Sequence, residues 1–214
     1  MNRLFKIAQA GLAGLFLVAT SSSSLEATIT GVNNGGVIIA PPASVFDNPG
    51  GATGDMQQGF NEKQNVLVTD PIATDLGTIP VGYTVSSHMI FLNPAGGFGS
   101  HGNVSWTFDG IILGVMSDGL GNLEFASDAQ LGNPGTAYPT PFATRGLEPI
   151  DGYFFVGNTL TLKTVVFPPD RGDWIRVVTL GVAVPEPSTY LLFGGFLSLA
   201  AFLKRRKTQV NEIS

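Results

Sequence analysis

The 214-residue chain contains no cysteine, and this absence excludes several kinds of structure and chemistry. Without thiols there are no disulfide bonds, so a folded part of the chain has to rest on its hydrophobic core. Thiolate metal sites and cysteine nucleophiles are excluded for the same reason. Histidine is nearly as scarce, and His88 and His101 are the only two in the chain.

Basic residues are scarce in the middle of the chain. Between Thr28 and Pro187 there are five lysines and arginines against fourteen aspartates and glutamates, a net charge of about −9. Binding to a phosphate backbone requires clustered cations, and this section has none. We therefore expect no nucleic acid among the partners of this protein.

Glycine and proline are frequent, at 28 and 14 residues, while charged residues make up only 13% of the chain. This composition is typical of turn-rich β structure rather than of helices. Short apolar runs are separated by glycine, proline, asparagine and aspartate, and no window in this middle section has the pattern of a capped amphipathic helix. We therefore expect an all-β fold, with one antiparallel β-sandwich or jelly-roll-like domain over residues 28–184.

Individual strands can be placed from the alternation of apolar and polar residues. Residues 104–108 alternate strictly, and Asp109 and Gly110 follow as a turn signal before the apolar residues 111–116. An aspartate-glycine pair between two such runs predicts a tight two-residue hairpin. A longer strand is expected at residues 83–92, and further strands are expected at residues 37–40, 65–69, 122–125, 153–156, 160–167 and 174–180.

The beginning of the chain has the order of features found in secretory signal peptides. Arg3 and Lys6 form a short positive region, residues 7–19 are apolar apart from one glutamine, and small and polar residues follow. The apolar run falls short of the roughly 20 residues that a membrane-spanning helix needs. We therefore expect export by a signal peptide over residues 1–27, cleaved at its end or, alternatively, within residues 22–24.

A second hydrophobic segment lies near the end of the chain and is followed by cations. Residues 190–203 are fourteen apolar or small residues, and Ser188 before them is a suitable helix N-cap. We expect a short transmembrane helix here, which would hold the protein at the inner membrane during transit. By the positive-inside rule, the basic cluster after it would keep that end on the cytoplasmic side. This cluster consists of Lys204, Arg205, Arg206 and Lys207.

A rigid motif stands in front of this segment and consists of Val184, Pro185, Glu186 and Pro187. The motif, the short hydrophobic helix and the basic cluster, in this order, resemble the PEP-CTERM sorting signal of Gram-negative bacteria. The resemblance implies that an exosortase-type membrane protease acts near the motif and delivers the protein to the cell surface or the extracellular space. It also implies an organism that makes exopolysaccharide, which becomes a candidate partner. Residues 185–207 then form the sorting signal, and residues 208–214 extend further than is usual in the family.

One acidic segment offers oxygen atoms of the kind that calcium binds, and it comprises Asp118, Asn122, Glu124 and Asp128. The segment lacks the full pattern of an EF-hand loop. Turn formation and solubility account for the same residues without a metal. We therefore expect no cofactor, with calcium at these four residues as the alternative.

The three residue types of a serine hydrolase triad occur close together in the sequence, as Ser105, His101 and Asp109. Ser105 and Asp109 would share one face of a strand, since they are four residues apart. No nucleophile-elbow motif accompanies them, and Thr107 on the same face is typical of a solvent-exposed surface. We therefore do not expect these residues to form a hydrolase site. Instead, we expect His88 at the polar edge of its strand and His101 in a glycine-rich loop.

Aromatic side chains offer a route to carbohydrate binding, because sugar rings stack on exposed aromatic faces. Trp106 lies on the apolar side of a strictly alternating strand, which predicts a core position. Trp174, Tyr138 and Tyr153 lie at strand starts or in loops, so we expect them to be more accessible.

These features together predict a non-enzymatic exported protein of the envelope or extracellular matrix, with a structural or glycan-associated role. The alternative is a secreted hydrolase acting on polysaccharide, which would need two carboxylates about 5–10 Å apart on either side of a cleft. The sequence alone does not pair its candidate acids, which are Asp109, Asp118, Glu124, Glu148 and Asp151.

Overall fold

A computed structural model describes residues 27–46, 54–94, 98–167 and 172–181 of the protein. These residues form twelve β-strands and one short helix, so the expected all-β fold is confirmed. They belong to a compact unit of the chain that spans Leu25–Pro185. The predicted signal peptide, apart from Ala27, and the predicted sorting signal with its tail lie outside the described residues. Within the ranges given above, no helix has the length and apolar character needed to span a membrane.

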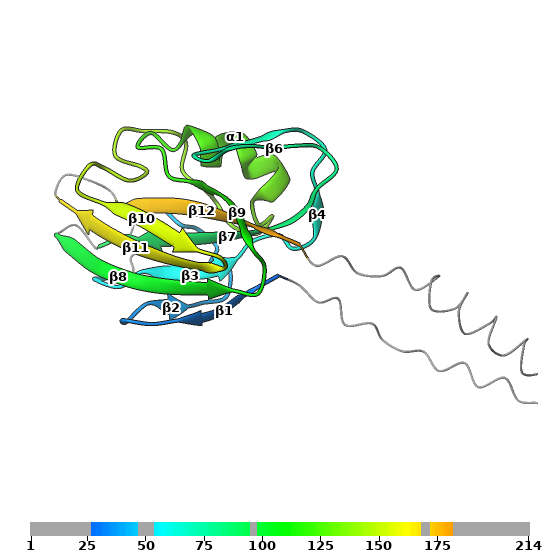
Figure 1. The fold of residues 1–214 in the computed structure, drawn as a ribbon. Coiled ribbons are helices and arrows are strands. Elements are labelled where there is room, and N and C mark those ends of the chain that lie inside the picture. The colour runs from blue at the N-terminus through cyan, green and yellow to red at the C-terminus, as the bar shows by residue number, and fades with distance from the viewer. Residues whose placement is uncertain (1–26, 47–53, 95–97, 168–171, 182–214) are drawn as a thin grey trace, which may run out of the picture. The chain divides into compact units, whose positions relative to one another are not determined.

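The first sheet has four antiparallel strands (Figure 1). In spatial order they are β1 (Ile29–Val32), β8 (Gly99–Phe108), β11 (Thr159–Val166) and β10 (Gly152–Val156). β10 and β11 form a hairpin, whose two-residue loop begins with Gly157 at a φ of 62°. Glycine at the first loop position allows this positive φ without steric cost. β10 is an edge strand, because β11 is its only strand neighbour among the described residues.

The second sheet is larger and mixed. Five of its strands lie in the order β2 (Val37–Ile38), β3 (Gln58–Asn61), β7 (Thr84–Leu92), β12 (Asp173–Leu180) and β9 (Ile112–Met116). These neighbours are antiparallel except for β2 and β3, which run parallel. The short strand β4 (Val66–Leu67) also pairs with β7. A separate ribbon consists of β5 (Ile72–Thr74) and β6 (Gly77–Ile79), and the helix α1 covers Asn122–Leu131.

The two sheets pack face to face through alternate side chains of their strands. Trp106 of β8 is fully buried in this core, together with Leu160 of β11, Ile90 of β7 and Val177 of β12. Its indole N–H donates a 2.9 Å hydrogen bond to the side-chain oxygen of Gln57, so its polar atom is satisfied. The predicted core position of Trp106 is therefore confirmed.

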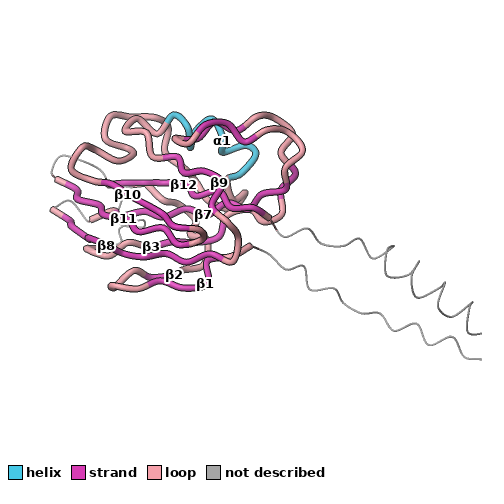
Figure 2. Tube along the Cα trace, in the orientation of Figure 1, coloured by secondary structure: helices cyan, strands magenta, loops and turns pink. Residues whose placement is uncertain are grey.

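The second sheet is also covered on the face that points away from the first sheet. Val85, Met116 and Val178 on this face pack with Leu131 of α1 and Ile72 of β5. Figure 2 shows α1 on this side of the second sheet, and Figure 1 shows β6 next to it. Because both faces are covered, β7 and β12 consist almost entirely of buried residues.

The hairpin expected between β8 and β9 is wrong. β8 belongs to the first sheet and β9 to the second, so the chain crosses between the sheets at Asp109 and Gly110. A two-residue turn of type I′ needs a positive φ at both loop positions, and neither residue has one. Instead, the Asp109 carboxylate accepts a hydrogen bond from the main-chain amide of Thr28. A Cβ atom on Gly110 would lie 2.5 Å from the carbonyl oxygen of Leu180, so glycine is required here for close packing.

The strand expected at residues 122–125 is also wrong, because these residues begin α1. The carboxylate of Asp118 accepts hydrogen bonds of 2.9 Å from the main-chain amides of Asn122 and Leu123. Amides in the first turn of a helix have no partner within the helix, so these two bonds stabilise its beginning. The prediction failed because Leu123 and Phe125 alternate with polar residues over a stretch too short to distinguish a strand from a helix.

The remaining predicted strands are confirmed with slightly different bounds, as β2, β4, β7, β10, β11 and β12. Four strands were not predicted, namely β1, β3, β5 and β6. These four have only three or four residues each, and three of them contain glycine. Glycine has a low intrinsic preference for strands, so these segments are held extended by their partners rather than by their own sequence.

Candidate functional site

A buried charged network lies between the second sheet and α1. Arg176 of β12 is fully buried, and each of the five guanidinium N–H groups has an acceptor. Two of them donate to the two carboxylate oxygens of Glu62, both at 2.7 Å. The other acceptors are the carbonyl of Glu124, the hydroxyl of Ser127 and the carboxylate of Asp128. This arginine therefore fastens α1 to the sheet and has no donor left for a ligand.

Two aromatic residues that were expected to be accessible to sugars have other contacts, Tyr138 with this network and Trp174 with the neighbouring apolar cluster. The Tyr138 ring centre lies 5.3 Å from the Arg176 guanidinium carbon, and the Tyr138 hydroxyl accepts a 2.8 Å hydrogen bond from the amide of Asn133. Trp174 is buried, and its indole N–H donates to the carbonyl of Val45 at 2.7 Å. The expected accessibility of Trp174 is therefore wrong, because its strand is covered on both faces.

The four residues of the alternative calcium site lie on α1 and on the turn before it, but they engage separate partners. Asp118 caps the helix and also accepts a 3.2 Å hydrogen bond from the Asn122 side chain. Asp128 forms a 2.9 Å ion pair with Arg176. The Glu124 carboxyl group is buried, and its oxygens have no hydrogen-bond partner in another described residue. The three carboxylates do not form a group with oxygens within 4.8 Å of one another.

The charge state of Glu124 is set by its burial. Burial raises the pKa of Glu124 to about 8, and the positive charge of nearby Arg145 opposes this effect only in part. Arg145 is also buried, and it donates a 3.2 Å hydrogen bond to the carbonyl of Gly121. Burial lowers the pKa of Arg145. At neutral pH Glu124 is therefore mainly an uncharged carboxylic acid, which is a poor ligand for a hard cation.

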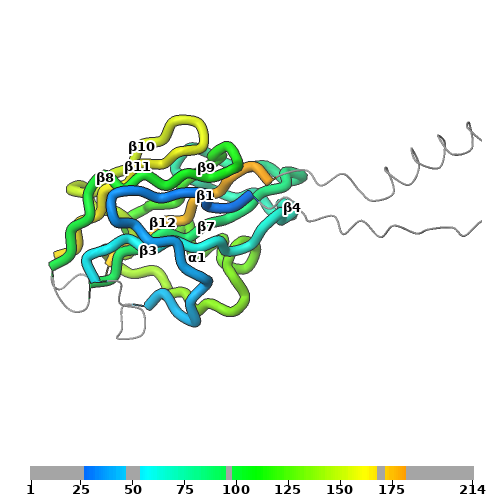
Figure 3. The backbone as a smooth tube through the Cα atoms, turned by 90° about the horizontal axis from the view of Figure 1, so that it is seen from below, coloured from blue at the N-terminus to red at the C-terminus, as the bar shows by residue number. Residues whose placement is uncertain are grey.

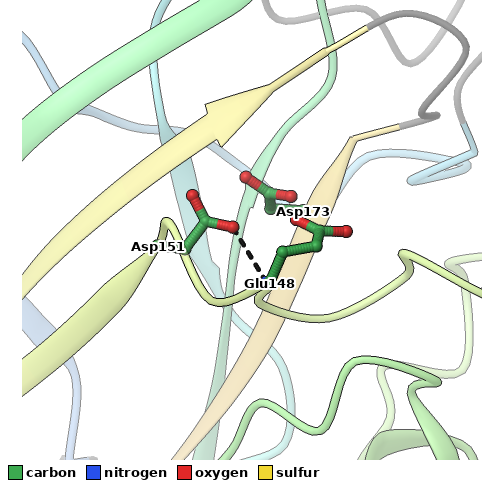
Figure 4. Close-up of side chains that lie close together, drawn as sticks. All are labelled: Glu148, Asp151 and Asp173. Atoms are coloured by element: carbon green, nitrogen blue, oxygen red, sulfur yellow. Dashed lines mark hydrogen bonds between the residues drawn. The ribbon is translucent and has the colours of Figure 1, made fainter.

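A different group of acids does come together, and it is shown in Figure 4. It consists of Glu148 and Asp151, in the segment before β10, and Asp173 at the start of β12. One carboxylate oxygen of each lies within 4.8 Å of the others. Oxygen donors at this spacing have the chemistry that a divalent cation such as calcium requires. Sequence reasoning missed this group because Asp173 is brought to the other two only by the packing of the two sheets.

Asp151 also has a structural role within this group. One of its carboxylate oxygens accepts a 2.9 Å hydrogen bond from the main-chain amide of Glu148, and the other accepts a 2.7 Å bond from that of Val165. The first bond closes the turn before β10, and the second ties this turn to β11. These two bonds explain the position of Asp151 without a metal.

His88 lies inside the protein, contrary to the expected position at a polar strand edge. It is fully buried in β7 and packs against Phe108, with ring centres 4.7 Å apart. Its Nδ1 is 2.8 Å from the Asn61 side-chain oxygen, and its Nε2 is 3.0 Å from the Thr179 hydroxyl. Burial lowers the pKa of His88 to about 3, so the ring is neutral over the whole physiological range.

Ser105, His101 and Asp109 do not form a catalytic triad. His101 lies in β8 rather than in a loop, and its Nδ1 accepts a 2.9 Å hydrogen bond from the amide of Gln57. Its Nε2 then carries the proton and donates to the carbonyl of Asn34 at 2.6 Å. The Ser105 hydroxyl forms a hydrogen bond with the Thr161 hydroxyl of β11, and the Asp109 carboxylate accepts a hydrogen bond from the main-chain amide of Thr28. Both ring nitrogens are occupied by the main chain, so the histidine does not activate the serine.

Comparisons of the chain with protein-family models, with characterised proteins and with solved structures found no match.

Proposed function

We propose that the protein is exported and sorted to the envelope or the extracellular matrix, where its antiparallel β-sandwich acts as a non-enzymatic structural or glycan-associated module. One observation carries this proposal: a rigid motif around Glu186, a short apolar segment and four consecutive cations follow one another near the end of the chain. In the PEP-CTERM family, which these features resemble, an exosortase-type protease acts at this motif. The apolar segment would hold the protein in the inner membrane until this step.

The extent of the folded unit supports the proposal. The compact unit that contains the described residues spans Leu25–Pro185, and β12, the last described strand, ends at Leu180. Loss of residues 1–27 and of the residues after the motif would leave every described strand and the core between the sheets in place. The chain contains no cysteine, so the module would rely on its core and on the Arg176 network after export.

Sorting can be tested by replacing Pro185, Glu186 and Pro187 together with alanine in the producing organism. We expect this variant to accumulate in the membrane fraction with its tail attached, because the protease would no longer act on it. The matched control is Glu212→Ala, which removes a carboxylate near the same end but outside the motif. Normal release of the triple variant, at the rate of the control, would show that the motif has no role in sorting.

The outer face of the first sheet supports a glycan-associated role. Hydroxyl groups pair across its central strands, with 3.0 Å between the oxygens of Ser105 and Thr161 and 3.5 Å between those of Thr107 and Thr159. Such uncharged groups can exchange hydrogen bonds with sugar hydroxyls without the cost of burying a charge. Tyr153 does not contribute here, because it packs against the core and its hydroxyl donates to Asp75.

This role can be tested by co-sedimentation of the protein with the exopolysaccharide of its producer. Thr107→Lys combined with Thr159→Lys should abolish binding, because two long cations would stand in the middle of the hydroxyl face. Thr78→Lys on the exposed β6 is the control and should bind like the wild type. A chelator should have no effect if the hydroxyl face is the site, whereas chelator-sensitive binding would point to Glu148, Asp151 and Asp173.

A secreted hydrolase acting on polysaccharide is the second candidate, and Glu148 and Asp151, with carboxylate oxygens within 4.8 Å of each other, are the pair of acids that it would use. Glycoside hydrolysis needs one carboxyl group as the acid and a second as the base or nucleophile. Glu148→Gln would remove the acid while keeping the shape of the side chain. Polysaccharide hydrolysis by the wild type that is lost in this variant, with the fold unchanged by circular dichroism, would establish the enzyme in place of the module.

A further inference from the structure

The outward side chains of the first sheet change in character at its edge. On β8 and β11 they are polar, namely Ser105, Thr107, Thr159, Thr161 and Lys163. On β10 the corresponding residues are Phe154 and Val156, which are 62% and 76% exposed. Tyr153 and Phe155, which alternate with them along the strand, point inward and pack against the core. The edge strand thus carries large apolar groups on the face where the inner strands carry hydroxyls.

The main chain of β10 also has unused hydrogen-bonding groups. Val156 and Thr159 flank a two-residue loop, and such a pair exchanges both of its main-chain hydrogen bonds. Pairs with and without hydrogen bonds alternate along an antiparallel ladder. The N–H and C=O groups of Tyr153 and Phe155 therefore point away from β11. No other described residue donates to them or accepts from them.

β10 lacks the features that commonly protect an edge strand from pairing. Exposed edges are usually protected by charged side chains, proline or a β-bulge. Gly152–Val156 contains no charge and no proline, and its five pairs with β11 run without a register shift. β1, at the opposite edge of the same sheet, does have a register irregularity between Ile29 and Gly31. Figure 3 shows β10 at the margin of the described domain.

We propose that β10 is a docking strand for a second copy of this chain, which adds its own β10 in antiparallel orientation. The two copies would be related by a two-fold axis through Phe154, so that Phe154 lies opposite the same residue of the second copy. Tyr153 of each copy then faces Phe155 of the other, and the four outward N–H and C=O groups of each strand are satisfied by four mutual hydrogen bonds. The result is one continuous eight-stranded sheet built from two four-stranded sheets.

The neutral character of β10 leaves it as a stretch where two copies of this chain can approach each other. Residues 28–187 carry about nine net negative charges, so two copies repel each other over most of their surfaces. β10 is a stretch where both surfaces are uncharged, and a two-fold axis through it brings only apolar and main-chain groups together. A basic partner strand would find no acid within β10 to pair with.

The size of the contact sets the expected strength of the dimer. Fully buried aromatic residues cover about 150–250 Å² each, and each copy contributes one partly exposed phenylalanine and one valine. The pairing therefore lies below the roughly 1,200 Å² at which stable interfaces begin. We expect a dimer that forms at high local protein concentration and dissociates on dilution, so the test has to trap it.

Disulfide trapping is well suited to this chain because it contains no cysteine. Phe154→Cys would place two thiols on directly opposed residues of a pair without hydrogen bonds, with Cα atoms about 4.5 Å apart, which a disulfide can bridge. Val156→Cys is the matched control, since it lies on the same strand and face and is more exposed. In the proposed register the two Val156 residues are about 13 Å apart along the strands, which is too far for a disulfide.

Both variants of the full chain would be purified in mild detergent and oxidised under identical conditions, and the disulfide-linked dimer would be followed over time. Phe154→Cys should be trapped at least about tenfold faster than Val156→Cys, because Cα atoms more than 7 Å apart are not bridged. Equal rates would indicate random collision and overturn the proposal. Faster trapping of Val156→Cys would overturn the register, and absence of trapping in both variants would exclude pairing at β10.

Discussion

Replacement of Arg176 by methionine should remove a large part of the stability of the domain. The substitution keeps a long apolar side chain in the same space but deletes all five hydrogen bonds and the positive charge. Glu62 would then be left buried, since its side chain has no exposed surface in the pair with Arg176. The Asp128 side chain is 22% exposed, so water compensates part of its loss.

The size of the effect follows mainly from Glu62. Removing one member of a buried ion pair typically costs about 3–5 kcal/mol, because the remaining charge stays buried without its counter-ion. The free energy of unfolding of a domain of this size is about 5–15 kcal/mol, so the loss is a large fraction of the total. Replacing Glu62 by methionine as well should restore about half of the loss, since an apolar pair of similar volume carries no buried charge.

The measurement is urea denaturation of the purified wild type, Arg176→Met and the double variant, followed by tryptophan fluorescence. Lys163→Met is the control, because the Lys163 ammonium is exposed and donates to a single carbonyl, that of Ile150. The control should change the free energy of unfolding by less than about 1 kcal/mol. A loss below 1 kcal/mol in Arg176→Met, or a double variant less stable than the single one, would refute the assignment of Arg176 as the link between α1 and the sheet.

Three further substitutions test other parts of the structure. Gly59→Ala would place a Cβ atom 2.6 Å from the Trp106 ring and should cost about 1–3 kcal/mol in a thermal melt, whereas Gly152→Ala, with open space around its Cβ, should cost less. Glu124→Gln should remove a pH dependence of the free energy of unfolding. The pKa of Glu124 is about 8 in the folded protein and 4.5 ordinarily, so between these pH values the native state keeps a proton that the unfolded chain releases. The stability of the wild type should therefore fall as the pH rises through this range, by up to about 1.4 kcal/mol per pH unit. A wild type whose stability is flat over this range would contradict the burial of Glu124 as an acid. Asp151→Asn replaces a carboxylate oxygen, which accepts a hydrogen bond from a main-chain amide, by an NH₂ group, which cannot accept one. It should lower the free energy of unfolding by about 1.5–3 kcal/mol. Asp55→Asn on the surface is the control and should have little effect in the same melt.

Much of the β structure could be predicted from the sequence because strand alternation is a local signal. Trp106 is the best example, since its neighbours alternate strictly and it lies in the core as expected. The pairing of strands was less accessible. Asp109 and Gly110 have the composition of a hairpin turn, yet the chain uses them to cross from one sheet to the other. Composition gives the bend but not the sheet to which the next strand belongs.

The buried polar groups depend on long-range contacts, and for this reason the sequence did not reveal them. Arg176 lies in a run of apolar residues, and its partners Glu62 and Asp128 come from distant segments. Asp173 joins Glu148 and Asp151 in the same way. Trp174 was expected to be accessible because it starts a strand, but the second sheet is covered on both faces.

The measurement that tests the central proposal most directly is the intact mass of the protein recovered from the surface or medium of the producing organism, together with the sequences of both ends. Export and exosortase-type sorting predict a mature chain that begins at Thr28 and ends close to Glu186. Its mass would be well below the 22.4 kDa of the full chain. A 22.4 kDa chain in the cytoplasm, with Met1 and the basic cluster still attached, would contradict the proposal.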